Sequence, residues 1–285
     1  MNENIYGGIE FGGTKTICAT GSKDGNISLQ IRIPTTTVDE TLSKIYDFFN
    51  KNKATTSIGI GTFGPLNLDQ SSDEFGYIYN TPKPGWEKVN LKGLIENGTK
   101  LAVNIDTDVN CAAIGEYNYG KAKDIENFVY ITIGTGIGGS LMINGKPYYG
   151  LSQIEMGHMY IPHEQFKDSF QGTCTYHKDC FEGIASGHAL HERYAQRGEV
   201  LTDETAWQLE ANYISTALTN IMLSFRPGLI ILGGGILNHS GLINLIREQV
   251  YQKINNYMEF PNLGDYIVQS SSNNNGVLGA INIAK

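Results

Sequence analysis

The chain has 285 residues, of which 40% are apolar and 18% charged, and its formal net charge is −8 with an isoelectric point near 5.3. The acidic balance argues against a nucleic-acid surface, which needs a basic face, and no apolar run approaches the roughly 18 to 20 residues that a membrane helix needs. The first residues have neither the basic head nor the apolar core of a signal peptide, so we expect a cytoplasmic protein without nucleic-acid or membrane partners.

Strand and helix signals alternate over the first 120 residues. The apolar runs 5–11 and 14–20 flank Gly12-Gly13 and predict a β-hairpin with a glycine tip. The other elements expected in this part are strands at 27–33, 57–62 and 101–105 and helices at 38–51 and 107–119, the last of them ended by Gly120.

The same hairpin pattern begins again at residue 128. Strands over 128–133 and 137–143 flank Gly134-Thr135-Gly136, and Asn144-Gly145 predicts a turn into a third strand. A duplicated unit of this kind is typical of two α/β domains, each with a parallel or mixed sheet. The remaining elements expected are helices at 204–225, 241–256 and 276–284 and a buried strand at 229–232.

Three glycine-rich segments, 12–15, 134–139 and 233–235, each follow an apolar strand. Without side chains, backbone N–H groups can converge on an anion, and neighbouring Thr or Lys residues add a hydroxyl or a charge. The spacing fits neither the P-loop nor the dinucleotide-binding motif. A single segment of this type is more often a plain tight turn, but three of them together predict a nucleotide site.

Cys174, His177 and Cys180 place three metal-ligand side chains within seven residues, and His158 lies sixteen residues upstream. Two thiolates and two imidazoles make a normal closed zinc site. The alternatives are incidental thiols, or a local disulfide between the two cysteines, which a cytoplasmic protein disfavours.

The strings GGIEFGGTK, ITIGTGIGGS, LIILGGGI and GVLGAINIAK resemble the ROK family of sugar kinases and repressors, and the resemblance covers essentially the whole chain. It implies an α/β fold of two ribonuclease-H-like domains, as in actin-like ATPases, that face each other across a cleft. The domains expected are residues 1–110 with 272–285, and residues 111–271, which carry the zinc loop. The ATP-binding residues that the resemblance implies are Gly12, Gly13, Thr14, Lys15, Gly134, Thr135, Gly136, Gly138, Gly233, Gly234 and Gly235.

The stretch VNIDTDVNCAAIGE places Asp106 and Asp108 where a strand passes into a helix. Acidic residues there can simply stabilise the helix start. The family pattern, Asn-Asp-x-Asn before a helix of small residues, maps Asp108 onto the catalytic base and Asn110 onto the second Asn, with Thr107 in place of the first. Asp106 is then a cap or a supporting residue. Glu10 stands where many relatives have Asp, as is familiar in the fructokinase branch.

The resemblance also implies sugar ligands. In the family, Glu155 and His158 of the segment EMGH and Glu182, which follows the cysteines of the zinc loop, correspond to residues that bind the sugar. By themselves, Glu155 and Glu182 could be solvated surface acids. The zinc loop has His177 as its middle ligand, and with the loops GTFGPLNLD and NTPKPGW it looks like bacterial ROK fructokinases more than glucokinases. The sugar-binding residues expected are Gly64, Pro65, Trp86, Thr107, Asp108, Glu155, His158 and Glu182, although Trp86 could be plain core.

The resemblance therefore implies an ATP-dependent fructokinase that makes fructose 6-phosphate with Mg²⁺, and a homodimer with a structural zinc held by His158, Cys174, His177 and Cys180. Mannose, glucose or an N-acetylhexosamine is the alternative substrate. The alternative that is not an enzyme is a ROK sugar sensor or repressor. We disfavour it because the chain keeps the base and the glycine tips, is acidic, and begins at the first phosphate hairpin without a helix-turn-helix.

Overall fold

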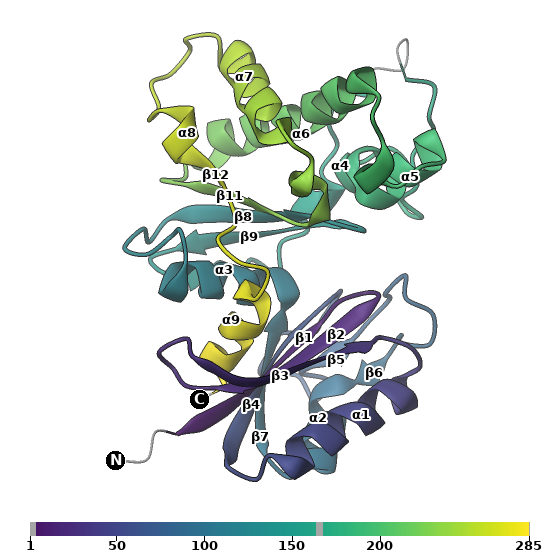
Figure 1. The fold of residues 1–285 in the computed structure, drawn as a ribbon, viewed down its shortest axis with the longest axis vertical. Coiled ribbons are helices and arrows are strands. Elements are labelled where there is room, and N and C mark those ends of the chain that lie inside the picture. The colour runs from purple at the N-terminus through teal and green to yellow at the C-terminus, as the bar shows by residue number, and fades with distance from the viewer. Residues whose placement is uncertain (1–3, 164–167, 285) are drawn as a thin grey trace. The chain divides into compact units, whose positions relative to one another are not determined.

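The protein is described by a computed structural model over residues 4–163 and 168–284, and it forms two compact α/β units (Figure 1). Within these described residues, no helix is both long enough and apolar enough to span a membrane. The first unit consists of Met1–Asp124, Gly145–Ile154 and Ser271–Lys285, and the second of Ile125–Asn144 and Glu155–Ser270.

Five strands form the main sheet of the first unit. In spatial order they are β3 (Ile27–Pro34), β2 (Lys15–Gly21), β1 (Ile5–Phe11), β4 (Thr55–Thr62) and β7 (Ala102–Thr107). The first three strands pair antiparallel, whereas β4 and β7 run parallel to β1. Both faces of β1 and β4 are covered, which explains their nearly continuous burial.

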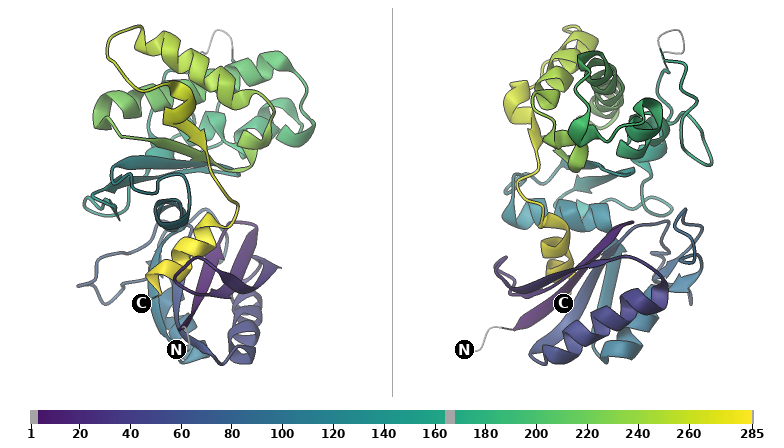
Figure 2. Two further views of the ribbon diagram at one scale, coloured as in Figure 1. Left: turned by 60° about the vertical axis from the view of Figure 1, so that its left-hand side comes forward. Right: turned by 45° about the vertical axis from the view of Figure 1, so that its right-hand side comes forward.

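Helices cover both faces of this sheet (Figures 1 and 2). On one face, α1 (Val38–Lys51) and α2 (Leu91–Thr99) share an apolar core with the sheet. On the other face lie α3 (Asp108–Tyr119) and α9 (Asn275–Ile283). The backbone of α9 comes so close that a Cβ atom at Gly59 would lie 1.8 Å from the carbonyl oxygen of Ala280, so only glycine fits there.

Two short strands complete the first unit. β5 (Tyr77–Ile78) pairs antiparallel with β6 (Val89–Asn90) in a separate small sheet.

The second unit repeats the hairpin and the parallel strands. The other five-stranded sheet lies in the order β10 (Lys146–Pro147), β9 (Ile137–Ile143), β8 (Phe128–Ile133), β11 (Ile230–Gly233) and β12 (Ile267–Gln269), where β10 is the two-residue strand predicted after the Asn144-Gly145 turn. β9 is antiparallel to β8, whereas β11 and β12 run parallel to it. Each unit therefore has an antiparallel hairpin next to parallel strands, which confirms the predicted duplication.

The helices of the second unit are dominated by one long pair. α6 (Glu204–Phe225) packs against α7 (Leu242–Ile254), and both are drawn over one face of the sheet in Figure 1. Buried residues recur along α6 at helical spacing, including Trp207 and Tyr213. The shorter helices are η1 (Met156–His158), α4 (Phe181–Ala185), α5 (Gly187–Tyr194), η2 (Gly198–Val200), η3 (Gly235–Asn238) and α8 (Leu263–Tyr266).

A buried carboxylate in the first unit joins two segments that are distant in sequence. Glu116 of α3 is 0% exposed. Its Oε1 accepts from the backbone N–H of Ser271 (2.8 Å) and from Nδ2 of Asn275 (2.6 Å), and its Oε2 accepts from the N–H of Lys121 (2.7 Å) and from Oγ of Ser271 (3.0 Å). Glu116 therefore holds the segments just before residue 125 and just after residue 270, which are the points where the chain leaves the first unit and returns to it.

We expect Glu116→Ala to lower the free energy of unfolding by about 3–5 kcal/mol, because several buried donors then lose a charged acceptor at once. Urea unfolding followed by circular dichroism measures this change. The control is Glu126→Ala, since Glu126 is exposed, and it should change stability by less than about 0.5 kcal/mol. Equal effects of the two substitutions would contradict the role given to Glu116.

Candidate functional site

The tip between β1 and β2 is an open turn. The N–H of Gly12 donates to the carbonyl oxygen of Lys15 at 2.9 Å, and a Cβ atom on Gly13 would have no heavy atom within 4 Å. Lys83 Nζ donates to the carbonyl of Gly13 at 2.6 Å and to that of Thr35 at 3.1 Å. The predicted ATP-binding residues 12–15 thus form a turn that can receive an anion. Lys83 was not predicted, although it lies in the quoted string NTPKPGW.

Glu10, near the end of β1, is a buried acid in an unusual state. Its Oε2 has no hydrogen-bond partner among the described residues. Burial and, next, the negative charge of Asp108 raise the pKa of Glu10 to about 7, although Lys15 acts in the opposite direction. A carboxylate oxygen without a partner, next to a second acid, is the kind of group that hydrated Mg²⁺ prefers. The residues present therefore fit a magnesium ion, with Glu10 and Asp108 as candidate ligands of its waters.

The raised pKa of Glu10 predicts a pH-dependent stability in the absence of metal and nucleotide. The folded-state pKa of Glu10 (about 7) exceeds the ordinary 4.5. The contribution of Glu10 to the free energy of unfolding is therefore fully present below about pH 4.5 and is lost as the pH rises through 7. We expect the free energy of unfolding of the wild type, minus that of Glu10→Gln, to fall by about 2–3 kcal/mol between roughly pH 5 and pH 8. Urea unfolding of both proteins across this range tests it, and a constant difference would refute it.

The junction of β7 and α3 positions Asp108. Thr107 caps the helix, since its Oγ1 accepts from the N–H of Asn110 at 3.2 Å. Asp108 is the first residue of α3 and is half-buried, and its Oδ1 accepts from the N–H of Val109 at 2.9 Å. A carboxylate in the first turn is favoured by the helix dipole. Asp108 therefore lies at the carboxyl end of a parallel strand, where it can accept a proton.

Asp106 supports this junction from inside the first unit. The hydroxyl of Tyr149 donates to its Oδ2, while Nδ2 of Asn110 (2.8 Å) and the N–H of Thr107 (2.7 Å) donate to its Oδ1. Burial raises the pKa of Asp106, and the three hydrogen bonds partly oppose that rise. Asp106 thus connects the strand end, the first turn of α3 and the segment around Tyr149. Tyr149 was not predicted, because no local pattern links it to residues 106–110.

In the second unit, the carboxylate of Glu182 is hydrogen-bonded to the glycine tip between β8 and β9. The N–H of Gly134 donates to the carbonyl of Gly136 at 2.9 Å, and Oε2 of Glu182 accepts from the N–H of Ile137 at 2.8 Å. The start of α5 also contacts this tip, since the N–H of Gly187 donates to the carbonyl of Gly134 at 2.7 Å. Glu182, predicted as a sugar ligand, therefore also fixes the tip that is predicted to bind ATP.

The triple glycine lies beside the same tip. β11 ends at Gly233, and Gly234 has a φ of +92°. A Cβ atom on Gly234 would lie 2.2 Å from the carbonyl oxygen of Ile133, whereas one on Gly235 would have nothing within 4 Å. The turn thus needs glycine for its conformation and its close packing, and it is open where Gly235 lies. The predicted residues 134–138 and 233–235 are brought together in the second unit.

The four predicted zinc ligands also come together. The ligand atoms of His158, Cys174, His177 and Cys180 all lie within 4.8 Å of one another. Nδ1 of His158 is 3.7 Å from Sγ of Cys174 and 3.5 Å from Sγ of Cys180, and Nδ1 of His177 is 3.6 Å from Sγ of Cys174. Atoms bound to one tetrahedral zinc ion are about 3.3–3.8 Å apart. Both cysteines are free thiols, so the residues fit a metal ion.

The other predicted sugar residues lie in different surroundings. Gly64 and Pro65 are joined by a cis peptide bond after β4. Trp86 is 0% exposed, its ring contacts Phe11 and Phe63, and its indole N–H donates to the carbonyl of Thr36 at 2.9 Å. Glu155 precedes η1 and is exposed. Contact of these residues with a sugar stays a prediction. In the structure, Trp86 is packed in the core of the first unit.

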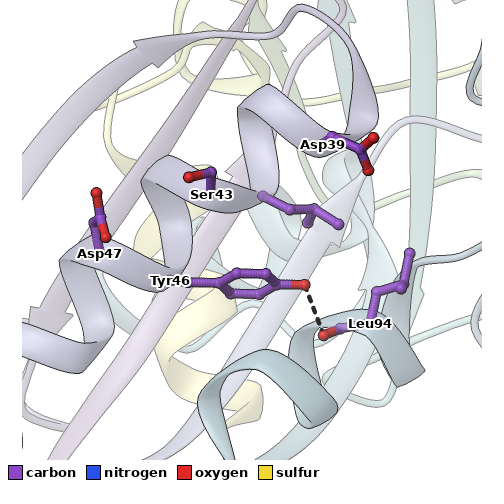
Figure 3. A pocket seen from close by; sticks show the side chains of 6 residues that line it. Asp39, Ser43, Tyr46, Asp47 and Leu94 are labelled. Carbon is purple, nitrogen blue, oxygen red and sulfur yellow. Dashed lines mark hydrogen bonds between the residues drawn. The ribbon is translucent and has the colours of Figure 1, made fainter.

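A surface groove of about 330 Å³ lies elsewhere in the first unit, between α1 and α2 (Figure 3). The hydroxyl of Tyr46 donates to the carbonyl of Leu94 across it at 2.8 Å. Its lining includes none of the predicted site residues, so the groove is not the candidate site.

Comparison with known proteins gives one family. The model of the ROK family matches residues 6–285. The fructokinase of Streptococcus mutans is 40% identical over 99% of this chain and 97% of its own, and the fructokinase of Pediococcus pentosaceus is 39% identical over 99% and 98%. The crystal structure of a ROK family glucokinase from Streptomyces griseus, in complex with glucose and AMPPNP, has a TM-score of 0.79 at 22% identity and covers 98% of this chain and 99% of that one. This likeness confirms the predicted actin-like ATPase fold.

Proposed function

The chain belongs to the ROK family, and on that premise we propose that it is an ATP-dependent fructokinase that converts D-fructose to fructose 6-phosphate. The observation that carries the proposal is an identity of 39–40% with two fructokinases along nearly the whole length of each. The open glycine turns and the acids at the strand ends are the groups that phosphoryl transfer requires, since this reaction depends on positioning, charge neutralisation and a base.

In the proposed reaction, the 6-hydroxyl oxygen of fructose attacks the γ-phosphorus of ATP, the bond from that phosphorus to the β,γ-bridging oxygen breaks, and ADP leaves. Asp108 accepts the hydroxyl proton. The backbone N–H groups of residues 12–15 and 134–138 bind phosphate oxygens. When bound, Mg²⁺ supplies charge neutralisation through phosphate oxygens and water, and Glu10 and Asp108 would hold its waters.

Fructose is bound in this proposal by Glu155, His158 and Glu182, whose carboxylates and imidazole suit pairs of sugar hydroxyls. The loop at residues 64–65, Trp86 and Thr107 complete the predicted set. His158 has two tasks. Its Nδ1 faces the thiols of the metal cluster, so its Nε2 can donate to a hydroxyl.

The metal proposed for the His158, Cys174, His177 and Cys180 cluster is a structural Zn²⁺. Thiolate and imidazole ligands suit zinc, and a closed set of four protein ligands has a structural rather than a catalytic role. The cluster lies directly before α4, which begins at Phe181 and carries Glu182. Zinc would therefore stiffen the segment that positions this acid.

We also propose a homodimer and a cytoplasmic location, where ATP is abundant and thiols stay reduced. Light scattering coupled to size-exclusion chromatography measures the oligomeric state, and a monomer at micromolar concentration would refute the dimer.

An ADP-release assay with ATP and Mg²⁺ tests the function, using fructose, glucose, mannose and N-acetylated hexosamines with zinc-replete protein. We expect turnover that is selective for fructose. Turnover on another hexose alone would keep the phosphoryl transfer and refute fructose as the substrate. No turnover on any sugar would favour a sugar sensor and would refute the role of Asp108.

A further inference from the structure

Two aromatic rings are stacked in the second unit, one buried and one partly exposed, and the proposed reaction uses neither. The imidazole of His239 lies flat on the indole of Trp207, with ring centroids 3.8 Å apart and an interplanar angle of 12°. Trp207 is 2% exposed, and its N–H donates to the carbonyl of Leu201 at 3.0 Å. His239 is half-buried. Solvent therefore reaches the histidine, whereas the tryptophan beneath it is fixed.

This stack adjoins the glycine turns. His239 follows η3, which begins at the open Gly235. A Cβ atom on Gly198 would lie 3.5 Å from both Ile236 of η3 and Trp207, and one on Gly187 would lie 3.5 Å from Ile236 and 2.7 Å from the carbonyl oxygen of Gly134. The β8–β9 tip, the triple-glycine turn and the ring stack are thus neighbours within the second unit, linked by contacts around Ile236.

We infer that His239 is the base-stacking residue of the nucleotide site, so that the purine ring of ATP lies on the imidazole that Trp207 supports from below. This inference rests on the proposed function, because it needs the triphosphate at residues 134–138 and 233–235. Ligands of α/β sheets bind at the carboxyl ends of the strands, and β11 leads directly to this turn. Stacking on an aromatic ring is sequence-tolerant, since every base has a flat face.

The state of the histidine agrees with this role. Burial lowers the pKa of His239, so the ring is neutral at physiological pH and stacks without the cost of desolvating a charge. Stacking contacts the face of the purine ring and not its hydrogen-bonding edge. The binding affinities of adenine and guanine nucleotides should therefore depend on His239 to a similar extent.

Calorimetric titration of the full chain with ATP, adenosine and inorganic tripolyphosphate in the presence of Mg²⁺ tests the inference without turnover. We expect His239→Ala to weaken the binding of ATP and of adenosine by about tenfold, as for loss of one base stack, and to leave tripolyphosphate binding unchanged. His239→Phe should retain most of the affinity. His191→Ala, which removes an exposed histidine of α5, is the control and should bind all three ligands like the wild type.

Unchanged ATP and adenosine binding by His239→Ala would overturn the inference while the proposed function stands. An equal loss for adenosine and tripolyphosphate in a variant with wild-type melting temperature would also overturn it, because the effect would not belong to the base. If His239→Ala fails to fold, the comparison of His239→Phe with the wild type decides, and a tenfold loss there contradicts stacking. Absence of ATP binding to the wild-type protein would instead refute the proposed function.

Discussion

Replacing Asp108 with asparagine is expected to lower kcat for fructose phosphorylation by about 100-fold or more, the usual range for loss of a general base. The amide keeps the size of the side chain but cannot accept the hydroxyl proton. The KM values for ATP and fructose should change by less than about threefold, because a base acts in the transition state more than in binding. Steady-state kinetics of both proteins gives these numbers.

The melting temperature of Asp108→Asn and a control substitution at a second acid show whether the loss of activity comes from catalysis or from folding. Asp108 is half-buried, so Asp108→Asn should melt close to the wild type. Asp24→Asn, at an exposed turn of the same unit, is the control and should retain full activity. If Asp108→Asn keeps a near-normal kcat, then Asp108 is not the base.

The elements carrying the glycine tips were predictable because their signals are local. Apolar strands on either side of Gly12-Gly13 and of Gly134-Thr135-Gly136 define hairpins without reference to the rest of the chain, and strand 128–133, strand 137–143 and helix 204–225 have the predicted bounds. The metal cluster was predictable for a similar reason, since three of its ligands lie within seven residues. The predicted domain division, residues 1–110 with 272–285 and residues 111–271, stays a prediction.

α2 was not predicted, and its sequence explains why. LKGLIENGT contains Gly93 and Gly98, which lower helix propensity by about 1 kcal/mol each relative to alanine. The helix forms because Leu91 and Ile95 are buried against the sheet in the core of the first unit. Tertiary packing decides its structure, and a local pattern does not contain that information.

The contacts that shape the candidate site were also beyond local patterns. Lys83 reaches Gly13 from 70 residues away, Tyr149 reaches Asp106 from 43 residues away, and Glu182 reaches Ile137 from 45. Such pairs depend on how the sheet brings loops together. The family resemblance supplied roles for Asp108 and Glu182, but it did not supply the neighbours that hold them.

Loss of the metal is the second large effect that we expect. Cys180→Ser should reduce bound zinc from about one ion per chain to below about 0.1, because a closed structural site needs all four ligands. Fructose turnover should fall with it, since Glu182 lies two residues after this ligand and bonds the N–H of Ile137 at 2.8 Å. Elemental analysis by mass spectrometry gives the metal content, and hydrogen exchange over residues 171–185 reports the order of the segment.

Cys18→Ala is the matched control for the loss of a buried thiol, because Cys18 lies in β2 and outside the cluster. It should retain zinc and leave exchange over residues 171–185 unchanged. Removal of zinc from the wild type by a chelator should reproduce the faster exchange of Cys180→Ser, and added zinc should reverse it in the wild type alone. A Cys180→Ser protein with full zinc content would contradict the ligand set. Zinc loss without faster exchange would show that the metal does not order the segment on which Glu182 depends.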